Sequence, residues 1–263
     1  MVGEMVVSQV PKLHVCGKTD VGRVRDHNED TIYWDTDLGL VLLADGMGGH
    51  NAGEVASALA VDTVKGFIES VLGPGVSSAG EKDDEALVVA AVSDANESIR
   101  RQAGSSPMYA GMGTTIVMAV FHGQTVTLAH VGDSRIYRLR DRALTQMTTD
   151  HSLVQELVEN GYLTHEEARA STNKNLITRA LGIDDSVEVA VRHDTSLSGD
   201  VFLFCSDGLT DLVPDEEIHT LLNLNLNVGE GEGELETAVD ALVDIANEKG
   251  GNDNISVILV RVE

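Results

Sequence analysis

Continuously apolar runs joined by very short connections are the feature that most restricts how this chain folds. Strand-like runs lie near residues 12–18, 31–36, 39–44, 114–122, 125–132, 134–140, 187–193, 201–206 and 255–262. Several, such as Leu40–Ala44, have no polar side, which indicates burial on both faces. The short connections at His122–Gln124 and Asp141–Arg142 are typical of hairpins, so neighbouring strands are expected to be antiparallel. An antiparallel sheet buried on both faces needs a covering layer on each side.

Helical periodicity supplies those covering layers. Apolar residues recur at i, i+3, i+4 and i+7 in three segments, which begin at Val64, Val88 and Leu235. Each segment therefore has one apolar stripe to pack against a sheet. Helices outside and antiparallel sheets inside predict an α+β fold, a four-layer α/β/β/α sandwich. The chain of 263 residues has no long polar linker, so residues 1–263 are expected to form a single domain.

Acidic residues cluster where the apolar runs begin or end. The five short acidic segments are Arg25–Asp30, Asp45–His50, Gly132–Arg135, Ser206–Gly208 and Asp253–Asn254. A carboxylate at the mouth of a buried strand is costly unless it meets a cation. If several of these strand ends converge, they make a metal site. The acids at Asp83–Glu85 and Asp215–Glu217 fit helices or turns instead and are expected to be solvated.

Composition narrows the possible ligands. The chain has 18 Lys plus Arg against 43 Asp plus Glu, a formal net charge of −25, which argues against nucleic acid and anionic membranes as partners. Carboxylates without a Cys/His cluster favour Mg²⁺ or Mn²⁺ over zinc. Cys16 and Cys205 are expected to be reduced core residues. No segment has the pattern of a leader or a membrane span, so the cytoplasm is the expected compartment.

Eight short motifs are spread over nearly the whole chain: Arg25–Asp30, Asp45–His50, Gly113–Thr115, His130–Arg135, Asp150–Ser152, Ile177–Gly182, Cys205–Gly208 and Asn252–Ser256. Taken together, they resemble the metal-dependent serine/threonine protein phosphatases of type 2C, the PPM family, in their compact bacterial form. Each motif alone is weak, but their order and spacing match the family. The resemblance implies the same four-layer sandwich, with the metal site at one end of the cleft between the sheets.

The resemblance also implies a set of metal ligands. Asp45 would bridge two Mn²⁺ or Mg²⁺ ions, and Asp207 and Asp253 would complete the first site. The backbone carbonyl of Gly46 would bind the second ion, and Asp30 would act through bound waters. A glycine at position 46 also makes physical sense, because no side chain then stands in the way of its carbonyl.

Three further residues are expected to act at this site. Asp133, together with Asp207, matches the position of a third, weaker metal in bacterial members of the family. Arg25 is the candidate for binding the substrate phosphate, since a guanidinium matches two phosphoryl oxygens; its alternative is an ion pair with Asp26 or Glu29. His50 is the candidate general acid. Its alternatives are a structural role at a helix start, with a metal-bound water serving as the acid.

A helical segment at about 150–181 corresponds to the family's mobile flap beside the active site. A helix is expected to start at His151–Leu157 and to end at Gly161, and Thr164–Glu167 has the pattern of a capping box that opens a second helix. An ordinary helical insertion is the alternative. His130 and His151 lie in family motifs but are expected to be structural, because one lies in a strand run and the other opens a helix.

The implied reaction is hydrolysis of phosphoserine and phosphothreonine in proteins by water held between two metal ions. The expected partners are a Hanks-type serine/threonine kinase and its targets, and the chain is expected to be a monomer. Three other functions stay open: a regulatory protein that keeps the fold without turnover, a calcium-binding structural module, and a two-metal hydrolase of phosphorylated small molecules. The calcium module is disfavoured because the chain lacks the Asp-rich loop of such sites.

Overall fold

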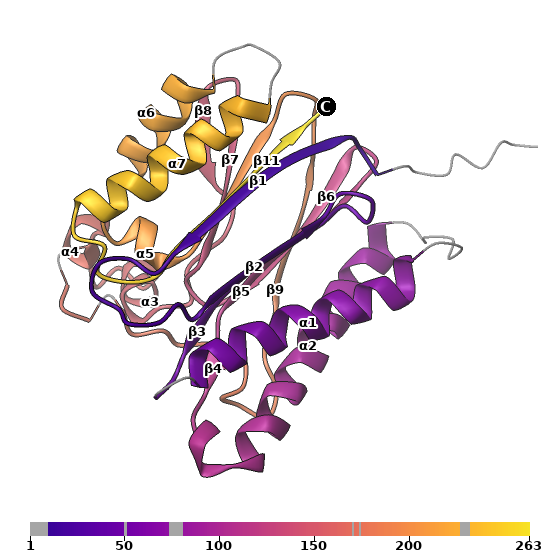
Figure 1. Ribbon diagram of the computed structural model, residues 1–263, viewed down its shortest axis with the longest axis vertical. Coiled ribbons are helices and arrows are strands. Elements are labelled where there is room, and N and C mark those ends of the chain that lie inside the picture. Colours follow the sequence, from indigo (N-terminus) through magenta and orange to yellow (C-terminus); the bar gives the residue numbers. More distant parts are fainter. Residues whose placement is uncertain (1–9, 50–51, 74–80, 170, 174, 227–231) are drawn as a thin grey trace, which may run out of the picture.

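Two antiparallel sheets lie face to face in the computed structural model, with helices on both outer sides (Figure 1). The structure describes residues 10–49, 52–73, 81–169, 171–173, 175–226 and 232–263. The first sheet has the order β1 (Leu13–Asp20), β11 (Ile255–Val262), β10 (Val201–Cys205), β7 (Arg135–Arg140) and β8 (Ala143–Gln146). The second has the order β2 (Asp30–Asp35), β3 (Leu40–Met47), β5 (Ile116–His122), β6 (Thr125–Val131) and β9 (Ala190–Thr195), and the short β4 (Gly113–Thr114) also pairs with β3.

Long helices cover the outer face of each sheet. Helices α1 (Ala52–Leu72) and α2 (Glu81–Ser105) lie against the second sheet, and α6 (Asp215–Asn225) and α7 (Glu232–Glu248) lie against the first (Figure 1). The shorter helices are η1 (Pro107–Tyr109), α3 (Leu153–Glu159), α4 (His165–Arg169) and α5 (Asp207–Thr210). None of the helices in the described ranges combines the length and apolar character of a membrane span. The predicted four-layer sandwich is confirmed.

Side-chain alternation along the strands divides the apolar residues among three cores. In β3, Leu42 faces the core under α1 and α2, whereas Leu43 faces the core between the sheets. In β10, Leu203 likewise faces α6 and α7, whereas Phe202 points between the sheets. There its ring meets Phe121 of β5 edge to face, with centroids 5.3 Å apart. The continuously apolar runs are thus explained, since both faces of these strands are buried.

The two predicted hairpins are confirmed. His122 pairs with Thr125 across the turn between β5 and β6, and Arg140 pairs with Ala143 across the turn between β7 and β8. Asp141 has φ of 50° and is followed by another residue with positive φ, as a two-residue hairpin with the strand twist requires.

The expectation that the acids at Asp83–Glu85 and Asp215–Glu217 are solvated was wrong for Asp84, whereas Asp215 is partly exposed. Asp84 in α2 is only 3% exposed, and its carboxylate lies 3.3 Å from Nδ1 of His122 at the end of β5. Asp215 at the start of α6 accepts a hydrogen bond of 3.1 Å from the Tyr137 hydroxyl. Both acids begin or lie in the first turns of helices that pack over strand ends, which brings them to polar groups on the sheets.

Candidate active site

The strand-end acids meet at one end of the sandwich. Asp30 is paired directly with Asp45, because β2 and β3 are antiparallel neighbours in that register. Asp207 follows β10 and Asp253 precedes β11, and these two strands are also antiparallel neighbours. Asp133 follows β6, which lies in the same sheet as β2 and β3 and faces the sheet of β10 and β11. The Asp45 carboxyl interacts electrostatically with all four of the others, so the convergence expected from the sequence is present.

The protein offsets the cost of burying these negatively charged carboxyl groups only in part. Burial raises the pKa of Asp30 to about 6, although hydrogen bonds with Ser256, Ser206 and Asp45 oppose the shift. Burial, reinforced by neighbouring carboxylates, holds the pKa of Asp45 and of Asp207 well above the ordinary range. Crowded carboxyls of this kind favour either protons or a cation.

The donor atoms in this cluster suit a hard divalent ion. Asp30 Oδ1 is buried and has no hydrogen-bond partner within the described part of the chain, so one buried acceptor is left over. All the side-chain donors are carboxylate oxygens, which Mg²⁺ and Mn²⁺ prefer. A Cβ on Gly46 would lie 2.2 Å from the Gly53 carbonyl oxygen and 2.6 Å from that of Glu29, so only glycine fits here. The residues therefore fit the metals that the sequence predicted.

The side chains do not yet form a coordination sphere. Among the described residues, no three His, Cys, Asp or Glu side chains converge closely enough to hold one ion as they stand. One reason is that the Asp253 carboxylate is turned toward Arg25, with Oδ2 2.6 Å from Nη2. An ion at this place would therefore compete with Arg25 for the Asp253 carboxylate.

Arg25 lies at the rim of the cluster, on the loop between β1 and β2. Its side chain is 51% exposed, and its ion-pair partner is Asp253, not Asp26 or Glu29 as the alternative interpretation had it. The hydrogen bond with Asp253 is the main cause that raises the pKa of Arg25 further. A guanidinium in this place is accessible to an incoming phosphate. His50, the predicted general acid, lies outside the described residues.

Two threonines that the sequence left without a role hold Asp45 in place. The Asp45 carbonyl accepts hydrogen bonds from the Thr115 amide and from the Thr114 hydroxyl, both at 2.8 Å. The Asp45 amide donates to Thr115 Oγ1 at 3.1 Å, and that oxygen also contacts Ser134 Oγ at 2.8 Å. The signal in the sequence was a pair of threonines that opens an apolar strand. Its partner became visible only in the fold.

Ser206 supports Asp30 in a similar way. Its hydroxyl donates to Asp30 Oδ2 at 2.9 Å and accepts from the Ser256 amide at 3.0 Å. A Cβ on Gly208, two residues later, would lie 2.0 Å from the Asn254 carbonyl oxygen. The Ser-Asp-Gly and Asp-Asn motifs are thus packed together through their backbones, and the glycine permits this approach.

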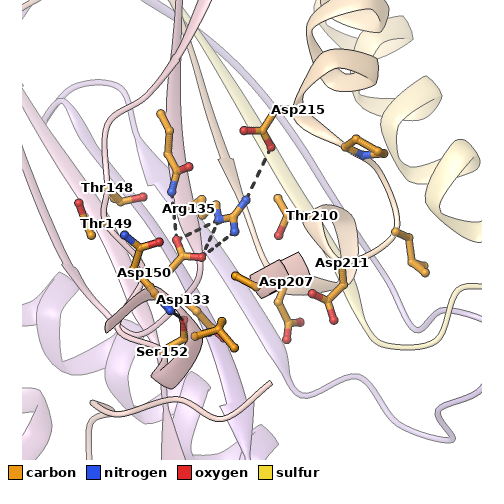
Figure 2. Close-up of a pocket in the computed structure, with 16 residues that line it drawn as sticks. Asp133, Arg135, Thr148, Thr149, Asp150, Ser152, Asp207, Thr210, Asp211 and Asp215 are labelled. Atoms are coloured by element: carbon orange, nitrogen blue, oxygen red, sulfur yellow. Dashed lines mark hydrogen bonds and ion pairs between the residues drawn. The ribbon is translucent and has the colours of Figure 1, made fainter. Parts of the chain in front are cut away.

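The segment at about 150–181, predicted as a flap, adjoins the acidic cluster through a cavity of about 510 Å³. Asp133 and Asp207 line it together with flap residues from the start of α3 and from α4. Figure 2 shows Arg135 between Asp150 and Asp215 in this cavity. The guanidinium donates to the Asp150 carboxylate through both Nε and Nη2, the latter at 2.6 Å. The predicted capping box is confirmed, since Thr164 and Glu167 exchange side-chain to backbone hydrogen bonds.

His130 and His151 make structural contacts between β6 and the flap. Their rings stack with centroids 4.6 Å apart. His130 Nε2 lies 2.8 Å from the Thr149 carbonyl oxygen, and His151 Nδ1 accepts from the Gly132 amide at 3.1 Å. Burial is the main cause that lowers the pKa of His151 to about 4, with help from His130 and Arg179. Both rings therefore fix the loop that carries Asp133.

Comparisons with known proteins agree with this geometry. The serine/threonine phosphatase stp of Listeria monocytogenes is 37% identical over 251 residues, which cover 94% of this chain and 95% of that protein. The Staphylococcus aureus serine/threonine phosphatase Stp1 has a similar structure, with a TM-score of 0.86, 35% identity and full coverage of both chains. The catalytic domain of the phosphatase PstP, solved in complex with two manganese ions, matches with a TM-score of 0.81 and 38% identity, covering 95% of this chain and 98% of that one. The family model for protein phosphatase 2C matches residues 22–249, and this chain belongs to that family.

Proposed function

We propose that this chain hydrolyses phosphoserine and phosphothreonine in proteins with the help of two Mn²⁺ or Mg²⁺ ions. The observation that carries this function is the convergence of five strand-end carboxyl groups with an accessible arginine at one end of the sandwich. Relatives that align over nearly the whole chain are named serine/threonine phosphatases, and one of them binds two manganese ions. Both facts support the same chemistry at this site.

The proposed ligands divide between the two sheets. Asp45 and the Gly46 carbonyl at the end of β3, with Asp207 and Asp253 beside β10 and β11, would hold the two ions, and Asp30 would act through bound waters. Asp133, which lines the cavity with Asp207, would contribute to a third, weaker site. When bound, such ions acidify a water between them and offset negative charge on the phosphoryl group.

The protein's own groups orient the substrate. Arg25 would direct its guanidinium at two phosphoryl oxygens, which requires it to loosen its hold on Asp253. The threonine contacts on the Asp45 backbone keep the central carboxylate fixed while this happens. His50 is the proposed donor of the proton that the departing serine or threonine oxygen needs.

The proposed substrates are phosphoproteins, and a Hanks-type kinase with its targets is the natural opponent. The cavity beside the flap offers room for chain segments around a phosphorylated residue. A two-metal hydrolase of small phosphorylated molecules is the competing function. Such an enzyme would share the acidic cluster, but its small substrate would not need this flanking cavity for binding.

Turnover of a phosphothreonine peptide and of p-nitrophenyl phosphate tests the proposal, each measured with Mn²⁺, with Mg²⁺ and with excess chelator. The Asp45→Asn variant should lose at least about a hundredfold in rate, because it removes charge from the central ligand. Asp141→Asn, on the exposed β7–β8 turn, is the matched control and should keep full activity. A folded protein without turnover in any metal would support the regulatory alternative. Hydrolysis of the small ester alone would support the small-molecule hydrolase.

A further inference from the structure

The loop that carries Arg25 has little apolar packing of its own. Residues 21–29 connect β1 to β2, and the side chains of residues 23–27 are all exposed. Ordering an exposed backbone costs about 1–2 kcal/mol per residue, so such a loop stays in one conformation only if polar contacts hold it. Three of the contacts that do so come from one side chain, Asn254.

Asn254 is only 5% exposed and binds the loop at three points. Its Nδ2 donates to the carbonyl oxygens of Val21, at 3.0 Å, and of His27, at 2.9 Å. Its Oδ1 accepts from the Glu29 amide at 2.8 Å. These anchor points lie on both sides of Arg25. A carboxamide is suited to this task because it offers two donors and one acceptor from a single planar group.

The loop also contacts the backbone of the segment that precedes Asn254. The Arg23 amide donates to the Gly251 carbonyl at 2.7 Å. A Cβ on Gly22 would lie 2.3 Å from the Asp253 carbonyl oxygen, so the two backbones touch directly. The loop thus contacts residues 251–254, directly before β11, at several points, although the two segments are more than 200 residues apart in the sequence.

Two adjacent residues, Asp253 and Asn254, therefore hold the guanidinium of Arg25 and the backbone on either side of it. Asp253 holds the guanidinium through Oδ2, and its Oδ1 accepts from the Asn254 amide at 2.9 Å. Asn254 in turn holds the backbone on either side of Arg25. If Asp253 bound a metal ion instead, the guanidinium would lose this partner, and the Asn254 contacts would still hold the loop on both sides of Arg25.

We propose that Asn254 is a positioning residue for phosphate recognition, acting through Arg25. This inference rests on the proposed phosphatase function, in which Arg25 binds the phosphoryl oxygens. Without the carboxamide, the loop samples other conformations, and the guanidinium is correctly placed for only part of the time. The expected consequence is weaker substrate binding with the metal site left intact.

A double-mutant cycle separates this role from a general structural one. Asn254→Ala and Arg25→Ala should each raise KM for a phosphothreonine peptide by roughly 10- to 100-fold, since small misplacements at such sites have effects of this size. The double variant should have a KM within about twofold of that of Arg25→Ala alone, because both changes remove the same interaction. The Mn²⁺ concentration for half-maximal activity should not change in Asn254→Ala.

Asn96→Ala is the matched control. Asn96 is also buried, and it holds a different loop by accepting from the Gly182 amide at 2.7 Å and donating to the Asp184 carbonyl at 3.1 Å. This variant should lose stability comparably but should leave KM unchanged. Equal effects on KM from the two asparagines would overturn the proposal. So would additive effects of Asn254→Ala and Arg25→Ala, or a shifted Mn²⁺ requirement in Asn254→Ala.

Hydrogen exchange tests the same contact without relying on turnover. In Asn254→Ala, peptides that span residues 21–29 should exchange at least about tenfold faster, because the Glu29 amide loses its acceptor. In Asn96→Ala, the faster exchange should appear at Gly182 instead. If wild-type protein shows no phosphatase activity, the proposed function fails, and unchanged exchange at residues 21–29 would separately refute the positioning role.

Discussion

Hydrogen bonds from single side chains reduce the cost of burying the acidic cluster, and Asp30 is the clearest example. Its carboxyl is buried, one oxygen accepts from Ser206, and the other has no partner within the described ranges. Burial is the main cause that raises its pKa to about 6. The hydroxyl of Ser206 is therefore a structural support for a carboxyl that the protein otherwise leaves poorly solvated.

Removing that hydroxyl should destabilise the protein measurably. Ser206→Ala leaves Asp30 Oδ2 and the Ser256 amide without their partner, which should cost about 1–3 kcal/mol in the free energy of unfolding. Urea denaturation in the presence of chelator measures this cost. Ser93→Ala removes an exposed hydroxyl bonded to Val89 within α2 and should change the stability by less than about 0.5 kcal/mol. Equal stability of the two variants would show that Ser206 does not support Asp30.

The sequence predicted the acids of the site but not the residues that hold them. Asp45 and Asp207 were recognisable because each follows an apolar run, and a charge beside a buried strand needs a reason. The contacts of Thr115 with Asp45 and of Asn254 with Glu29 join residues 70 and 225 positions apart. Such contacts depend on which strands are neighbours, and a short polar side chain carries no mark of its future partner.

At the scale of elements, the flap is joined to the sheet through a neutral histidine. His151 accepts from the Gly132 amide and stacks on His130, and both contacts suit an uncharged ring. Its pKa of about 4 lies below the usual value near 6.5. The unfolded chain therefore binds a proton more readily than the native state, so stability present above about pH 6.5 is lost as the pH falls toward about 4.

The variant His151→Asn tests this pH dependence. The asparagine Oδ1 can accept from the Gly132 amide as Nδ1 does, but it does not titrate. Between about pH 6.5 and 4, the free energy of unfolding of the wild type should fall more steeply than that of the variant. Chemical denaturation at a series of pH values gives both slopes. Parallel slopes would mean that His151 titrates normally in the native state.

Elements with a continuous apolar signal were predictable, and those without it were not. The run at 201–206 matches β10 closely, because both of its faces are buried. The turn before β8 was predicted, but the strand itself, Ala143–Gln146, was not among the predicted runs, because only four residues form it and its side chains alternate between exposed and half-buried. The run expected at 187–193 is shifted, since the strand β9 begins three residues later, at Ala190. Exposed polar residues within β9 interrupt its apolar pattern, so its bounds were harder to predict.

At the scale of the whole molecule, the packing between the two sheets carries much of the stability. Phe202→Ala would leave a cavity opposite Phe121 and should cost about 3–5 kcal/mol in the free energy of unfolding. Met108→Ala, at a side chain that is 69% exposed, should cost less than about 0.5 kcal/mol. Thermal or chemical denaturation compares the two. A loss below about 1 kcal/mol for Phe202→Ala would mean that the sheets repack without this contact.

The four-layer arrangement followed from the sequence, but the order of strands within each sheet did not. Apolar faces on every long strand and three amphipathic helices left few arrangements other than sheets between helices. The pairing of β1 with β11, which joins the two ends of the chain, leaves no local trace in the sequence. That pairing is what brings the Arg25 loop to Asp253 and completes the site.

Anomalous diffraction from crystals grown with Mn²⁺ tests the central claim most directly, because it locates the ions independently of any activity. Two strong peaks should lie among Asp45, Gly46, Asp207 and Asp253, with the Asp253 carboxylate turned away from Arg25. Crystals of the Asp45→Asn variant should lose these peaks. Manganese bound elsewhere, or absent at a concentration that supports turnover, would contradict the assignment of this acidic cluster as the metal site.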